Sequence, residues 1–137
     1  MSETAKRPLP NIKEADTADF WAATKNQEFN IQVCANCGQI TWYPRAHCAH
    51  CTDGDLQTKV VTGHGEVYSY SIVRQSYHPF FRNLVPYVVA WVDLAEGVRY
   101  LTNVVECAPE DVHVGMPVSI HWEAHEELKL PMVKPQA

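Results

Sequence analysis

The hydrophobic pattern of the first third of the chain predicts an arm, a helix and a strand. Residues 1–15 contain two prolines and no apolar period, so we expect a loose arm there. Residues 16–27 have the spacing of a short amphipathic helix, with Phe20 and Thr24 on one face. Residues 29–33 then alternate between apolar and polar side chains, which predicts a strand that leads into a cysteine-rich segment.

From residue 56 onward the pattern is that of strands. Five segments are rich in β-branched and aromatic residues, and most of them alternate with a period of two. They span residues 56–62, 65–75, 86–94, 98–106 and 118–123. One helical turn is expected between Pro109 and Gly115, just before the last strand. Short strands without long helices or an internal repeat favour a small closed β-barrel of the OB type.

Four cysteines between Val33 and Asp53 form two Cys-x-x-Cys pairs. A spacing of two residues lets both sulfurs of a pair face one ion, and two pairs complete a tetrahedron that suits zinc. Four thiolates leave no open position for water or substrate, so we expect one structural zinc ion per chain. His47 and His50 stand beside the cysteines and could replace a ligand in principle, but four thiolates already suffice. The predicted ligands are Cys34, Cys37, Cys48 and Cys51.

The strand pattern and the cysteine pairs together predict a mainly β fold in three parts. Residues 1–32 form an N-terminal arm and helix, residues 33–57 a zinc ribbon, and residues 58–137 a five-stranded OB-fold barrel.

The connection between the second and third predicted strands concentrates aromatic and basic side chains. Such residues can stack on an adenine and pair with phosphates, which fits coenzyme A or a single-stranded nucleic acid. Two adjacent phenylalanines in a loop can equally form an apolar patch that contacts a protein partner. Ligand contact and partner contact both remain open for this connection. The candidate binding residues are Arg74, Tyr77, His78, Phe80, Phe81 and Arg82.

Other chemically reactive side chains do not form a catalytic motif. Cys107 has no base nearby in the sequence, so we interpret it as a small buried or loop cysteine. The run that starts at His125 resembles a zinc-protease motif, but Lys129 occupies the place of the second histidine. Glu110 and Asp111 are typical of the first turn of a helix. We therefore expect no catalytic residue in this chain.

Composition and charge narrow the functional classes. The chain has 137 residues, which suits one domain or one domain with a small appendage. No segment approaches the roughly 20 apolar residues of a membrane span, so we expect no membrane partner. The formal net charge of −5 counts against a nucleic-acid partner. The first residues lack the features of a secretory signal, which favours the cytoplasm and reduced cysteines.

The order of these motifs resembles a known family. The sequence is similar, over about residues 19–123, to the bacterial and archaeal family long labelled domain of unknown function thirty-five. That family joins an N-terminal helix and a rubredoxin-like zinc ribbon to an OB-fold. Ala49 and Tyr43 stand where the family often has proline, and neither is a predicted ligand. The matching motifs are Phe20-Trp21, Gln32-x-Cys34-x-x-Cys37-Gly38, Pro44-Arg45-x-x-Cys48-x-x-Cys51, Gly63-x-Gly65, Leu94-x-x-Gly97 and Gly115-Met116-Pro117-Val118.

The resemblance implies a role beside an enzyme. Proteins of this family accompany thiolase-like enzymes, polyketide acyltransferases and the lipid-transfer-type aldolases that shorten steroid side chains. We therefore expect a non-catalytic accessory subunit that docks on such an enzyme in a heterotetramer and stabilises or activates it. A coenzyme A thioester is the candidate ligand of the assembly. Two alternatives stay open: a stand-alone acyl-CoA-binding protein and an OB module that binds single-stranded nucleic acid.

Overall fold

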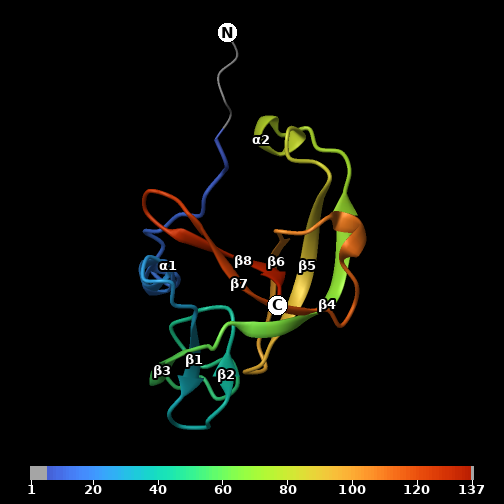
Figure 1. Cartoon of the computed structure of the whole chain (residues 1–137). Coiled ribbons are helices and arrows are strands. Elements are labelled where there is room, and N and C mark those ends of the chain that lie inside the picture. Colours follow the sequence, from blue (N-terminus) through green and yellow to red (C-terminus); the bar gives the residue numbers. More distant parts are fainter. Residues whose placement is uncertain (1–5, 137) are drawn as a thin grey trace.

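The chain forms a helix and a small three-stranded sheet, followed by a closed barrel of five strands (Figure 1). The computed structural model describes residues 6–136. Its elements are α1 (Ala18–Thr24), β1 (Asn30–Cys34), β2 (Ile40–Thr41), β3 (Leu56–Val60), β4 (His64–Val73), α2 (Pro79–Arg82), β5 (Tyr87–Leu94), β6 (Arg99–Val104), a 3-10 turn (Pro109–Asp111), β7 (Pro117–Ala124) and β8 (Lys129–Pro135). The predicted mainly β fold with an N-terminal helix and a five-stranded barrel is confirmed.

The barrel has the strand order β4-β5-β6-β8-β7 and closes where β7 pairs with β4. All neighbours are antiparallel except β6 and β8, which meet in parallel at Val104 and Val133. Gly65 of β4 pairs with both β5 and β7, and an added Cβ there would lie 2.5 Å from the carbonyl oxygen of Asp93. Only glycine therefore fits this crossing point. The interior is filled by apolar side chains, among them Val67, Val88, Val92, Val118 and Val133.

One strand assignment made from the sequence is wrong, and one strand was missed. The segment that starts at Leu56 is not a barrel strand, because β3 pairs with β1 and completes the sheet β2-β1-β3. The fifth barrel strand is β8, which the sequence pattern did not indicate. Its two prolines obscure the strand pattern, since proline cannot donate to a sheet ladder. The Pro131 carbonyl nevertheless accepts hydrogen bonds from Tyr100 Oη at 3.1 Å and Thr102 Oγ1 at 2.8 Å.

Helix α1 is shorter than predicted and is held to the barrel by Thr24. This side chain is fully buried, and its Oγ1 donates to the carbonyl of Trp21 at 2.6 Å. The same oxygen accepts from the backbone N–H of Lys129, the first residue of β8, at 3.2 Å. None of the helices among residues 6–136 has the length and apolar character needed to cross a bilayer.

A cluster of aromatic rings joins the ribbon and α1 to the barrel. We call Phe20, Phe29, Trp42 and Tyr100 the aromatic junction. The Phe29 ring lies 5.1 Å from Phe20, 5.0 Å from Trp42 and 4.9 Å from Tyr100, measured between ring centroids. Phe20 and Phe29 belong to the same buried cluster as the barrel valines. The ribbon and the barrel therefore share one hydrophobic core.

Candidate functional sites

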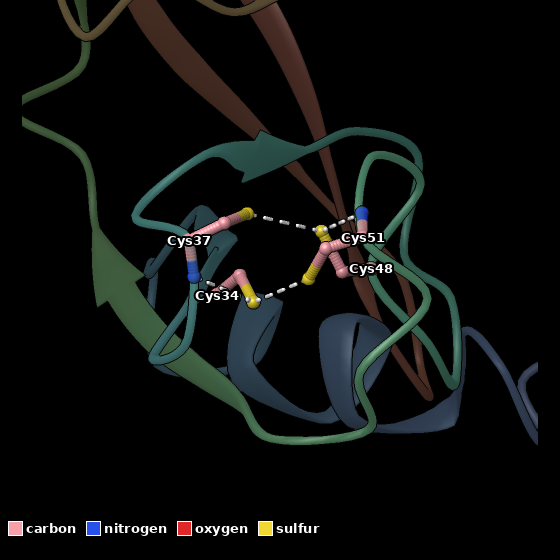
Figure 2. Close-up of side chains that lie close together, drawn as sticks. All are labelled: Cys34, Cys37, Cys48 and Cys51. Atoms are coloured by element: carbon pink, nitrogen blue, oxygen red, sulfur yellow. Dashed lines mark hydrogen bonds between the residues drawn. The ribbon is translucent and has the colours of Figure 1, made fainter.

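Two matching backbone turns present the four cysteines. In the first, the N–H of Gly38 donates to the carbonyl of Cys34 at 2.9 Å, and in the second the N–H of Thr52 donates to that of Cys48 at 3.0 Å. Each turn ends in a left-handed residue, with φ of 75° at Gly38 and 66° at Thr52. The four side chains turn toward one another, as Figure 2 shows, with Cys34 beside Cys51 and Cys37 beside Cys48.

The sulfur positions fit a zinc ion. All four sulfurs lie within 4.8 Å of one another, with 3.5 Å between those of Cys34 and Cys51 and 3.6 Å between those of Cys37 and Cys48. A tetrahedron with zinc–sulfur bonds of about 2.3 Å has edges of about 3.8 Å. The structure thus brings the four predicted ligands together, while His47 and His50 are exposed and lie outside the group. Four thiolates would fill the coordination sphere and leave no position for a substrate.

Local hydrogen bonds lower the pKa of Cys48 and Cys51, whereas the pKa of Cys37 is raised. The backbone N–H groups of Cys51 and His50 point at the Cys48 sulfur and lower the pKa of Cys48 to about 6. The backbone N–H of Gln39 lowers the pKa of Cys37, but burial and the other cysteine side chains outweigh it and raise that pKa to about 12. A divalent cation at the centre supplies the positive charge that four adjacent thiolates require.

The other predicted binding residues form a separate lobe at the far end of the barrel. We call residues 74–87 the α2 lobe, and Figure 1 shows α2 and the ribbon at opposite ends of the molecule. The one-turn helix α2 starts after His78, whose Nδ1 accepts from the N–H of Phe80 at 3.1 Å. Arg82 Nη2 donates to the carbonyl of Tyr77 at 2.9 Å, which folds the lobe back on itself.

The lobe exposes its polar and cationic side chains and partly covers its phenylalanines. Tyr77 is 82% exposed, and Arg74, His78 and Arg82 are also exposed. Phe80 and Phe81 are half-buried and pack edge to face with a centroid distance of 5.1 Å. The lobe contains no aspartate or glutamate. It is therefore a basic segment in an acidic chain.

One cation that the sequence did not single out completes the lobe. Arg7 lies with its guanidinium carbon 4.9 Å from the ring centroid of Phe80 and 5.4 Å from that of Phe81. Its Nε is 3.0 Å from Glu123 Oε1, which also lies 2.8 Å from His125 Nε2. The arm predicted to be loose is thus anchored at Arg7. No local sequence signal could show this, because the contacts come from three separate segments.

A groove between the ribbon and the barrel is the second feature that the sequence did not indicate. It has a volume of about 480 Å³. Its walls come from the arm, α1, the ribbon, β6 and β8, and they include Trp42, Tyr43, Leu101 and Met132. The groove adjoins the aromatic junction, since Phe29 also lines it.

Cys107 and the nearby acids do not form a reactive pair. Cys107 is half-buried, and burial together with the negative charge of Asp111 raises its pKa. A thiol with a raised pKa is a poor nucleophile near neutral pH. Glu110 and Asp111 lie in the 3-10 turn, as acids of its first turn.

Comparison with known proteins identifies the family. Residues 21–57 match the rubredoxin-like zinc ribbon domain of ChsH2, and residues 58–123 match the C-terminal OB-fold domain of ChsH2. A DUF35 domain-containing scaffold protein of Methanocaldococcus jannaschii is 37% identical over 100 residues, which cover 72% of this chain and 70% of that protein. A probable enoyl-CoA hydratase alpha subunit of Thermomonospora curvata is 42% identical over 132 residues. That match covers 96% of this chain but only 40% of the relative.

A solved structure agrees with these matches. The structure described as Ltp2-ChsH2(DUF35) aldolase contains a chain that is 42% identical and superimposes with a TM-score of 0.81. The superposition covers 94% of this chain and 98% of that chain. The zinc ribbon, the OB-fold barrel and the similarity over most of both sequences show that this chain belongs to the DUF35 family.

Proposed function

We propose that this protein is a non-catalytic subunit that docks on an enzyme of the thiolase superfamily and stabilises or activates it. The enzyme would be a thiolase, an acyltransferase or a steroid side-chain aldolase that acts on an acyl-CoA thioester. The names of the relatives support a subunit role, since they include a scaffold protein, an alpha subunit and an Ltp2-ChsH2 aldolase.

The observation that carries the proposal is the closed four-cysteine site. Among residues 6–136 it is the one group of three or more side chains able to hold a metal ion, and it offers no open coordination position. The remaining thiol, Cys107, has a raised pKa. A site of this kind stabilises a small segment and makes its surface rigid, and a rigid surface is what a docking module requires.

We propose further that the α2 lobe contacts the coenzyme A part of the substrate. Coenzyme A carries phosphates and an adenine ring. Arg74 and Arg82 are exposed cations without an acidic neighbour in the lobe, and the exposed Tyr77 ring can stack on a base. The lobe would supply these groups at the boundary with the enzyme, while the enzyme supplies the reacting groups.

Co-purification tests the subunit role. The chain is co-expressed with the Ltp2 subunit of the solved Ltp2-ChsH2 aldolase, and the mass of the purified species is measured by light scattering. We expect a complex with the mass of a heterotetramer and an aldolase activity that falls when this chain is omitted. A chain that stays monomeric, both with Ltp2 and with thiolase-like enzymes encoded beside its own gene, would contradict the proposal.

Titration with coenzyme A tests the lobe. In the purified complex, Arg74→Ala should weaken coenzyme A binding measured by calorimetry by about tenfold, because one charge-assisted contact to a phosphate is lost. Lys59→Ala is the matched control, since Lys59 is an exposed cation in the ribbon sheet. Equal affinities of both variants for coenzyme A would show that the lobe is not part of the coenzyme A site. Full affinity in the isolated chain would indicate a stand-alone acyl-CoA-binding protein.

A further inference from the structure

An apolar strip crosses the outer surface of the barrel beside the groove. Trp91 of β5 and Leu101 of β6 are direct cross-strand partners, and they are 39% and 48% exposed. Leu101 also lines the groove together with Tyr43, which is 50% exposed. The groove and the strip are therefore continuous. In soluble proteins, single exposed apolar side chains are common, whereas a large continuous apolar surface marks an interaction site.

The strip continues past Trp91 to a paired cation and a further aromatic ring. Arg99 and Asp93 are the next cross-strand pair on the same face, two residues from Leu101 and Trp91. The Arg99 guanidinium carbon lies 3.5 Å from the ring centroid of Tyr68, which is 50% exposed. We call the groove and this strip, from Tyr43 through Leu101 and Trp91 to Tyr68, the docking face.

The charges of the docking face are neutralised within the chain. Arg99 binds Asp93 through two nitrogen–oxygen contacts of 2.6 and 3.2 Å. Among residues 6–136, Arg7 is the one charged residue that lines the groove, and it pairs with Glu123. The whole chain, in contrast, has 11 basic and 16 acidic residues. Glu66 of β4, the cross-strand partner of Asp93, is an exposed acid at the edge of the strip, whereas Trp91 and Leu101 at its centre carry no charge. Such a centre complements an apolar surface, because depletion of charge and enrichment of aromatic residues distinguish the centre of a protein interface.

The extent of the face favours a protein over a small molecule. The groove alone could hold a small ligand, but a ligand there would leave Trp91 and Tyr68 in water. The groove together with the strip presents a continuous surface that runs from Tyr43 to Tyr68, which is more than one small ligand covers.

We propose that the partner subunit binds this chain through the docking face. The partner presents an uncharged surface with an apolar ridge that enters the groove, and Trp91 and Leu101 form the centre of the contact. This inference rests on the proposed subunit role and assigns the surface that performs it. It distinguishes docking from coenzyme A contact, because residues 74–87 of the α2 lobe do not belong to the docking face, although Arg7 contacts both the lobe and the groove.

Variants of matched exposure test the assignment. The Ltp2 subunit is the probe, and its affinity for each zinc-loaded variant is measured by surface plasmon resonance. We expect Trp91→Ala to weaken binding about 30-fold and Leu101→Lys about 100-fold, as substitutions at the centre of an interface do. Val60→Lys is the control, because Val60 is also a strand residue and is 49% exposed, but lies on β3. It should bind within about threefold of the unchanged chain, since contacts outside the interface contribute little.

Oxidative footprinting gives a second readout that needs no variant. We expect Trp91 and Tyr43 to lose reactivity toward hydroxyl radicals when Ltp2 is added. Undiminished reactivity of both side chains in the complex, or equal affinities of Trp91→Ala and Val60→Lys, would overturn the docking face while leaving the subunit role intact. If the unchanged chain does not bind Ltp2, the same variants are measured with the thiolase-like enzymes encoded beside its own gene, and failure with all of them would overturn the subunit role and the docking face with it.

Discussion

Replacing Phe29 with alanine tests whether the aromatic junction holds the ribbon against the barrel. Phe29 is 1% exposed and immediately precedes β1, so its backbone belongs to the ribbon side. Its ring contacts Phe20 of α1, Trp42 after β2 and Tyr100 of β6. Truncation at this position would remove the one ring that touches all three partners.

The expected loss of stability follows from the burial and the ring contacts. Truncation of a buried phenylalanine to alanine costs about 3–5 kcal/mol of unfolding free energy. Aromatic pairs add about 0.5–1.5 kcal/mol each beyond the buried area, and neighbouring contributions do not add fully. We therefore expect Phe29→Ala to lower the unfolding free energy by about 5 kcal/mol. The whole unfolding free energy of a domain is only about 5–15 kcal/mol. Phe29→Leu keeps most of the apolar volume and should lose about 2 kcal/mol.

Urea titration of zinc-loaded protein, followed by tryptophan fluorescence and circular dichroism, measures these losses. Val60→Ala is the control and should change the unfolding free energy by less than about 0.5 kcal/mol, because its side chain is half-exposed on an edge strand. If Phe29→Ala lowers the unfolding free energy by less than about 2 kcal/mol, the shared core is refuted, because truncation of a buried ring with three aromatic neighbours costs more than that.

Three further predictions concern the metal centre, the barrel closure and acid stability. Elemental analysis should find one zinc ion per chain. Cys34→Ser should lower both the zinc content and the melting temperature, because part of the free energy of metal binding stabilises the fold. A metal-free protein with an unchanged melting curve would contradict this prediction. Gly65→Ala should lose about 2–3 kcal/mol in urea titration, since its Cβ would collide with the Asp93 carbonyl; wild-type stability would show that β4 can move away. Burial raises the pKa of Glu96, but the hydrogen bonds, led by that from the Thr62 N–H, outweigh it and lower the pKa below 4.5. This carboxylate therefore stabilises the fold above pH 4.5, and its contribution is lost as the pH falls through its lowered pKa. The melting temperature of Glu96→Gln should consequently depend less on pH below pH 4.5 than that of the unchanged chain. An identical pH dependence in both proteins would show that Glu96 does not contribute to the acid response.

Local patterns in the sequence predicted the parts of the structure that depend on neighbours along the chain. The two cysteine pairs specify their own turns, so the ligand cluster followed from spacing alone. Alternation in β4 and β7 and a nearly continuous apolar run in β5 indicate strands, and β4, β5, β6 and β7 lie close to the predicted segments. His78 and Pro79 carry an N-cap and an N1 proline, a helix-start signal that could have identified α2 inside the predicted connection.

Pairing between distant segments could not be predicted in this way. A strand pattern at residues 56–60 does not say which sheet the strand joins, and β3 pairs with β1. β8 closes the barrel through a parallel contact with β6 and an antiparallel one with β7, although its prolines weaken the pattern. The contact between Arg7 and Glu123 likewise depends on the complete fold. The docking face was missed for the same reason, since its residues come from the arm, α1, the ribbon and the barrel strands β4, β5, β6 and β8.

The position of the ligands along the chain has a consequence for synthesis. All four thiols precede residue 52, and the ribbon sheet is complete at Val60, whereas the barrel cannot close before β8 has been made. Translation at about 5–20 residues per second separates these points by roughly 4–15 s. A nascent chain can therefore bind its metal while the strands of the barrel are still unpaired. A shortage of zinc would act on the polypeptide at the ribosome, before the barrel exists.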